Sequence, residues 1–232
     1  MIRIINVTLL CTIYSSICFA NQPDTTLQKF VPPHWEIISQ ANGDLNADGQ
    51  TDTAIIIQPQ NKPQNNNQQQ RKLLILFQTQ SNQQLQLKLS RQIPNWTYRS
   101  EDECLEDALD DSALTIKNQR LDLQFNTSPS CSNSYGFLYT YKFKLKNNQF
   151  HLVGFDSYAL DKISGQQDEI SLNFLTRKAK LTTTPNIFAE IETPPKIVWK
   201  TIQTNTRYTL ENIPLDSDEF NHHFSLKFIG EK

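Results

Sequence analysis

The chain has 232 residues, of which 38% are hydrophobic and 10% aromatic, so it has the composition of a globular domain with a core and not of a disordered protein. Its 22 Lys and Arg against 24 Asp and Glu give a formal net charge of −2, which lacks the basic field of a nucleic-acid-binding protein. Its six glycines form no cluster that could cradle a phosphate group.

Residues 1–20 have the pattern of a secretory signal peptide. Arg3 supplies the positive start, residues 4–17 are mostly apolar, and Ala20 is a small residue at the expected cleavage point before Asn21. The apolar run is shorter than the roughly 20 residues needed to span a bilayer. We therefore expect a single mainly-β domain over 21–232, without a membrane span, that is periplasmic or secreted.

From residue 35 onward the hydrophobic pattern is mainly that of β-strands. A candidate helical turn at 24–30 comes before it and ends at Pro32 and Pro33. Asn147 and Asn148 tolerate the positive φ angles of a tight hairpin turn. Antiparallel sheets with one short helix are expected, arranged as a sandwich, an open barrel or a propeller-like stack. The predicted strands are 35–39, 53–57, 72–79, 84–89, 113–117, 120–125, 136–146, 149–157, 169–174, 178–183, 196–203 and 223–229.

Segment 100–111 is the best helix candidate. Ser100 and Glu103 form a capping-box pattern, and apolar residues recur at helical spacing behind them. The many acidic residues at 101–111 have two interpretations: a cation site or docking patch, or the solvated face of a helix. The helical spacing of the apolar residues favours the solvated face.

Two segments are expected to lie apart from the β scaffold. Residues 58–70 are almost wholly Gln, Asn, Pro and Lys, which predicts a surface loop. Prolines interrupt the strand pattern at Pro185, Pro194 and Pro195, so residues 182–232 are predicted to form a looser C-terminal extension.

Signal cleavage would leave two cysteines, Cys104 and Cys131. A lone pair in an oxidising compartment most simply forms a disulfide bond. A nucleophilic cysteine and a metal thiolate are the competing interpretations, but neither residue has a conspicuous histidine partner or a Cys-x-x-Cys spacing. We therefore predict a disulfide bond between Cys104 and Cys131.

Residues 44–52 read Asp-Leu-Asn-Ala-Asp-Gly-Gln-Thr-Asp. Side-chain oxygens recur at alternate positions, a backbone carbonyl is available at position 7, and Gly49 permits a sharp turn, as a calcium-binding loop requires. Ile55 stands where an EF-hand would place its bidentate Glu, and the flanks read as strands. An Asx-rich turn that binds no metal is the alternative.

The loop resembles the calcium loops of FG-GAP (VCBS) and integrin-alpha-type repeats, in which the same pattern runs directly into an apolar strand. The resemblance implies a structural calcium ion bound by Asp44, Asn46, Asp48, the carbonyl of Gln50 and Asp52. The chain carries the motif once, which argues against a full propeller. It is also similar to small exported bacterial proteins of unassigned role with a single loop of this kind.

A search for catalytic motifs finds no nucleophile elbow, zinc-hydrolase motif, P-loop or dinucleotide-binding fingerprint. The four histidines, His34, His151, His222 and His223, are expected at the surface. We therefore expect a non-catalytic exported protein that binds another envelope or secreted protein, in an inhibitor or immunity-type role. An envelope hydrolase with an unrecognised acidic site is the alternative, and a structural envelope component is the third.

Overall fold

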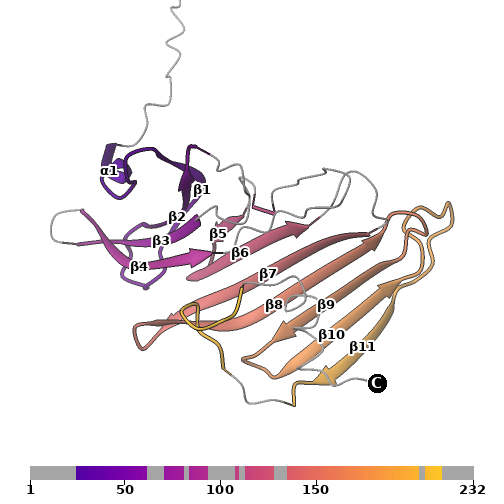
Figure 1. The fold of residues 1–232 in the computed structure, drawn as a ribbon. Helices are drawn as coiled ribbons and strands as arrows, with labels where there is room; N and C mark the ends of the chain where they lie inside the picture. The colour runs from indigo at the N-terminus through magenta and orange to yellow at the C-terminus, as the bar shows by residue number, and fades with distance from the viewer. Residues whose placement is uncertain are drawn as a thin grey trace, which may run out of the picture.

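The computed structural model describes residues 25–61, 71–80, 84–93, 108–109, 113–127, 135–203 and 207–215. They form two antiparallel sheets, shown in Figure 1, with strand orders β1-β2-β3-β4 and β11-β10-β9-β8-β7-β6-β5. Within each sheet every strand therefore pairs with its neighbours in sequence, and the described strands do not close into a barrel. The mainly β, antiparallel fold expected from the sequence is confirmed.

The element bounds agree closely with the sequence pattern. The helix α1 spans Thr25–Gln28, within the predicted helical turn at 24–30. The first sheet comprises β1 (Trp35–Gly43), β2 (Asp52–Pro59), β3 (Arg71–Gln78) and β4 (Leu85–Ile93). The second comprises β5 (Leu114–Ile116), β6 (Arg120–Thr127), β7 (Tyr135–Lys146), β8 (Gln149–Asp161), β9 (Gln167–Asn173), β10 (Lys178–Thr184) and β11 (Lys196–Thr201).

Several sequence predictions fall outside the described residues. They are the signal peptide 1–20, the strand 223–229, the disulfide bond between Cys104 and Cys131, and most of the helix 100–111. Ala108 and Leu109, the described part of that predicted helix, have irregular backbone and are buried in the main core. Among the described residues, no helix has the length and apolar character needed to cross a membrane.

Strand β2 is buried on both faces. Ala54 and Ile56 pack into the main core between the two sheets, whereas Ile55 and Ile57 pack with Leu27 of α1 in a separate outer cluster. All four β2 residues are at most 1% exposed, which explains why the strand reads as a continuous apolar run without alternation. The same division continues in β3, with Leu73 and Ile75 in the main core and Leu74 and Leu76 in the outer cluster. The first sheet is therefore a middle layer.

The polar segment after β2 begins later than the sequence predicts. Gln58 is buried and belongs to β2, although its residue type suggested a loop. The buried guanidinium of Arg71 explains this, since Nε and Nη2 donate to Gln58 Oε1 at 3.1 and 2.9 Å. Gln58 Nε2 in turn donates to Glu36 Oε1 at 2.8 Å. A buried guanidinium needs acceptors, so the glutamine is held inside the fold.

The second sheet has one apolar face and one polar face. Phe125, Tyr141 and Phe155, on three neighbouring strands, are fully buried in the main core, and the Tyr141 and Phe155 ring centroids lie 4.9 Å apart. Along β7, for example, buried side chains alternate with more exposed ones. This alternation is the period-two pattern of a half-buried antiparallel strand.

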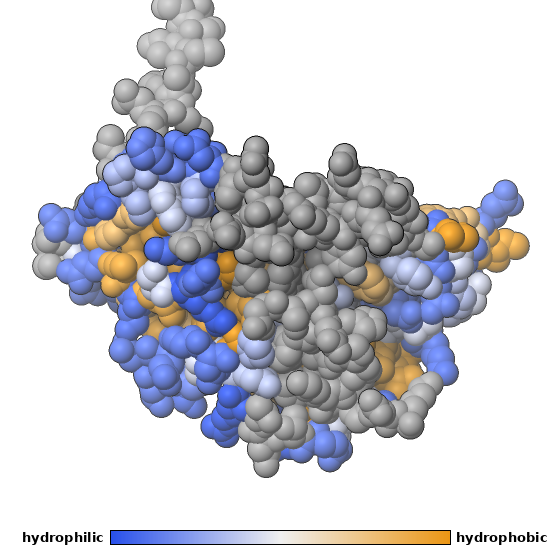
Figure 2. Space-filling view, viewed as in Figure 1, coloured by the Kyte–Doolittle hydropathy of each residue, from blue (hydrophilic) through white to orange (hydrophobic). Residues whose placement is uncertain are grey.

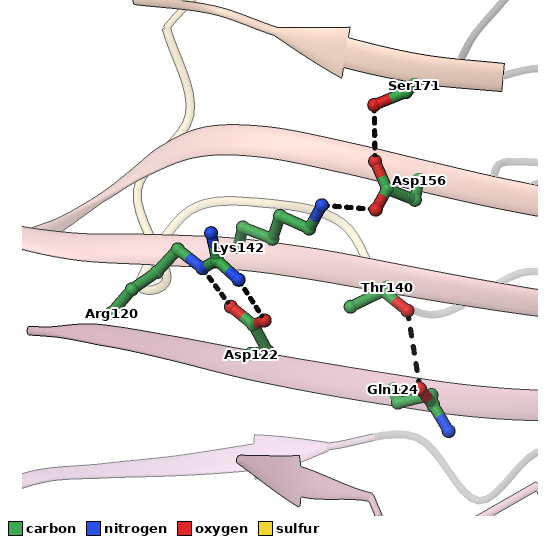
Figure 3. A network of polar contacts seen from close by, with 7 residues as sticks. All are labelled: Arg120, Asp122, Gln124, Thr140, Lys142, Asp156 and Ser171. Carbon is green, nitrogen blue, oxygen red and sulfur yellow. Dashed lines mark hydrogen bonds and ion pairs between the residues drawn. The ribbon is translucent and has the colours of Figure 1, made fainter. Parts of the chain in front are cut away.

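Figure 3 shows polar residues of this sheet linked to one another, some within one strand and others across neighbouring strands. Arg120 Nε and Nη2 donate to the two carboxylate oxygens of Asp122, each at 2.6 Å. Lys142 on β7 forms an ion pair with Asp156 on β8, which also accepts a 2.8 Å hydrogen bond from Ser171 Oγ on β9. The acidic groups of this network are therefore neutralised within it.

The tight hairpin between β7 and β8 forms as predicted. Asn147 and Asn148 adopt φ angles of 49° and 66°. Asn118 and Gln119, between β5 and β6, have φ angles of 54° and 57°. Both pairs have the two consecutive positive φ angles of a type I′ turn, whose twist matches that of the flanking strands.

Segment 207–215 returns to the second sheet. Leu152 N donates to Tyr208 O at 2.9 Å and Leu210 N donates to Phe150 O at 2.7 Å. The segment thus pairs with the start of β8. The strand β9 pairs with β8 only from Gly154 onward, so the two do not compete for the same residues. Leu210, Ile213 and Leu215, each at most 1% exposed, lie in the main core. This part of the predicted C-terminal extension is therefore integrated into the fold.

Because β2 is buried on both faces, Ile55→Ala and Ile56→Ala should destabilise the protein to a similar degree. Each substitution should lower the free energy of unfolding by about 2–5 kcal/mol, measured by urea denaturation. Ile163→Ala is the matched control, since Ile163 is 80% exposed, and should change stability by less than about 0.5 kcal/mol. A near-neutral Ile55→Ala variant would contradict the packing of the outer cluster.

Candidate functional site

The predicted calcium loop is the connection between β1 and β2. Gly43 and Asp52 form the last cross-strand pair, and residues 44–51 connect them. The backbone winds through positive φ angles at Ala47 (63°) and Gly49 (80°). No atom lies within 4 Å of the position that a Cβ at Gly49 would occupy, so backbone conformation, and not space, favours glycine there. The sharp turn that the sequence predicted at Gly49 is present.

Three polar side chains of the loop are held by hydrogen bonds from the loop itself. Asp44 Oδ1 accepts from Ala47 N at 2.7 Å and Asp44 Oδ2 accepts from Gly49 N at 3.1 Å. Asn46 Oδ1 accepts from Asp48 N at 3.0 Å, and Asp48 Oδ1 accepts from Gln50 N at 2.8 Å. These bonds fix the orientation of the carboxylates relative to the winding backbone.

Asp52 has a different role in the structure. Its side chain is fully buried, and its carboxylate accepts from Leu45 N at 2.8 Å and from Gln78 N, at the end of β3, at 3.1 Å. Burial raises the pKa of Asp52, and the negative charge of Asp48 adds to this, while the hydrogen bonds from Leu45 and Gln78 oppose it. One carboxylate thus joins the loop to both β2 and β3.

The chemistry of the loop fits calcium. Its donors are carboxylate, amide and carbonyl oxygens, which a hard cation prefers, and a carboxylate oxygen that accepts one hydrogen bond retains a second lone pair. Within the described residues, no three His, Cys, Asp or Glu side chains already form a metal-binding group. The structure thus brings Asp44, Asn46 and Asp48 into one hydrogen-bonded turn. The Asp52 carboxylate instead accepts from the backbone of Leu45 and Gln78.

A second group of polar residues was missed by the sequence analysis. Lys144, Lys146 and His151 of the β7–β8 hairpin share a cavity with Arg207, which lies far along the chain. The alternating lysines of β7 were visible in the sequence, but the pairing of segment 207–210 with β8 was not. Of the other histidines, His34 is exposed, and His222 and His223 lie outside the described residues.

No family model matches the chain, and no match was found among curated proteins or among solved structures. The function must therefore be inferred from the residues of this chain.

Asp52→Ala should lower stability more than Asp48→Ala when both are measured in excess chelator. Loss of Asp52 leaves Leu45 N and Gln78 N without their acceptor, at a cost of about 2–3 kcal/mol. Among the described residues, the Asp48 side chain bonds only within the part-buried loop, so its loss should cost less than about 1 kcal/mol. Urea denaturation measures both values, and equal losses would show that Asp52 does not join the loop to the fold.

Proposed function

We propose that this chain is a non-catalytic exported β-protein in which a calcium ion stabilises the first sheet and the edge of the second sheet binds another envelope or secreted protein. An inhibitor or immunity-type role in the periplasm or outside the cell is part of this proposal. The export step is supported by the signal pattern of residues 1–20. The calcium step is supported by the structure of the loop 44–52.

The observation that carries the calcium step is the dual attachment of Asp52. This carboxylate ends the candidate loop and at the same time bonds Leu45 N and Gln78 N. An ion bound to the loop would therefore act on β2 and β3, the strands with the most completely buried side chains of the first sheet. Calcium would also compensate the negative charge that Asp44, Asp48 and Asp52 bring together.

Calcium should raise the melting temperature, since the unfolded chain has no assembled site. At 100-fold excess over Kd the gain is about 2.7 kcal/mol, which is roughly 5–10 °C for a domain of this size. Asp48→Ala should abolish the shift. Magnesium should substitute poorly, because it demands a compact octahedral site. Differential scanning calorimetry in calcium and in excess chelator provides the measurement.

Asp161→Ala is the matched control for this experiment. Asp161 also caps a turn, accepting from Ile163 N at 2.9 Å and from Ser164 Oγ at 2.8 Å, but it lies outside the loop. This variant should keep the full calcium response. Identical melting of the native protein in calcium and chelator, together with a metal-free elemental analysis, would refute the calcium step.

The partner-binding step is supported by the exposed edge strand β11. Among the described strands β11 pairs only with β10, and Ile197, Val198 and Trp199 are 48%, 38% and 63% exposed. Figure 2 shows apolar surface on the side of the molecule where β10 and β11 lie in Figure 1. Such an edge offers backbone hydrogen bonds and apolar contacts to an extended segment of another protein. Lys196 and Lys200 at either end favour an acidic partner segment.

Replacement of the edge residues should abolish partner binding without unfolding the protein. Immobilised native protein should retain a stoichiometric partner from an envelope extract, and a Val198→Lys/Trp199→Ser variant should lose it, because charge on an edge strand disfavours added strands. Ile163→Ser, at an exposed apolar residue in the β8–β9 turn, is the control and should retain the partner. Equal retention by all three proteins would exclude the β11 edge.

A further inference from the structure

A cavity of 510 Å³ opens at one end of the second sheet. Three segments of the described chain line it: the β7–β8 hairpin, the residues that follow β9, and the start of segment 207–215. Tyr208 O accepts the hydrogen bond from Leu152 N, so the third segment is fixed against the hairpin. The volume lies within the roughly 300–1,000 Å³ of small-molecule sites.

Among the described residues, the charged side chains that line this cavity are all basic. They are Lys144, Lys146 and Arg207, with His151 beside them, and none of the described lining residues is Asp or Glu. Lys144 pairs across the strands with His151 on one side and Arg120 on the other, so its direct neighbours bring no negative charge.

The nearby acids of the sheet are already neutralised. Both carboxylate oxygens of Asp122 accept from Arg120 at 2.6 Å, and Asp156 is paired with Lys142 and Ser171. In the described part of the chain, the Lys144 and Lys146 ammonium groups and the Arg207 guanidinium have no acidic partner. Clustered like charges are unfavourable unless an anion compensates them.

The remaining lining of the cavity is mainly apolar. Leu152 is 8% exposed, and Val153, Phe174 and Tyr208 are half-buried. Cationic groups beside an apolar wall suit a ligand that has an acidic head and an apolar body.

We propose that this cavity binds a small soluble organic anion, whose carboxylate or phosphate group contacts Lys144, Lys146 and Arg207 and whose apolar part packs on Leu152, Phe174 and Tyr208. This site is independent of the calcium loop and of the β11 edge. It adds a small-molecule ligand to a protein whose proposed partner is another protein.

Octyl phosphate below its micellar concentration is a suitable probe, with binding measured by isothermal titration calorimetry. The native protein should bind it saturably at one site, whereas octanol and inorganic phosphate should each bind at least about tenfold more weakly, since each lacks one half of the interaction. Lys146→Gln/Arg207→Gln should weaken octyl phosphate binding by about tenfold or more. Both side chains are exposed, so the variant should keep the native melting temperature.

Lys162→Gln/Lys178→Gln is the control, because it removes the same charge from exposed positions that do not line the cavity. Its affinity for octyl phosphate should equal that of the native protein. An equal loss in both double variants would overturn the proposal, because it would show a general effect of net charge. Binding to phosphatidylglycerol vesicles without binding of octyl phosphate would also overturn it in favour of a membrane surface.

Discussion

Burial of β2 and β3 on both faces is the constraint on which the rest of the structure depends. Ile56 and Ile75 face the second sheet, while Ile55 and Leu74 face the outer cluster around Leu27. Neither cluster can form unless the first sheet lies between the second sheet and the N-terminal segment. The hydrophobic gain of two interfaces is thus concentrated in two short strands, which makes this sheet the place where a local stabiliser has the largest effect.

The candidate loop is attached to that same sheet. Asp52 is the first residue of β2, and its carboxylate holds the loop through Leu45 N and the end of β3 through Gln78 N. The two surfaces proposed to bind ligands, by contrast, belong to the second sheet: the β11 edge and the basic cavity beside β7 and β8. In the proposed function, stabilisation and binding therefore belong to different sheets, which share one core.

The parts of this fold that local sequence determines were predicted correctly. The run at 53–57 identified the doubly buried strand, and Asn147 with Asn148 identified the β7–β8 turn, because both patterns reflect the conformation of the residues themselves. Contacts between distant segments were not predictable in this way. Gln58 was predicted to lie in a loop because its partner Arg71 lies beyond the polar segment. Likewise, the sequence around Arg207 did not indicate that this residue lines the same cavity as Lys144 and His151.

Hydrogen–deuterium exchange in calcium and in chelator tests the central claim most directly, namely that an ion in the loop acts on the doubly buried sheet. Calcium should slow exchange by about tenfold or more over 44–52 and at Gln78, because local opening there would require release of the ion. Exchange over β11 should be unchanged, since that strand lies at the far edge of the other sheet. Unchanged exchange over 44–52 in saturating calcium would contradict the account.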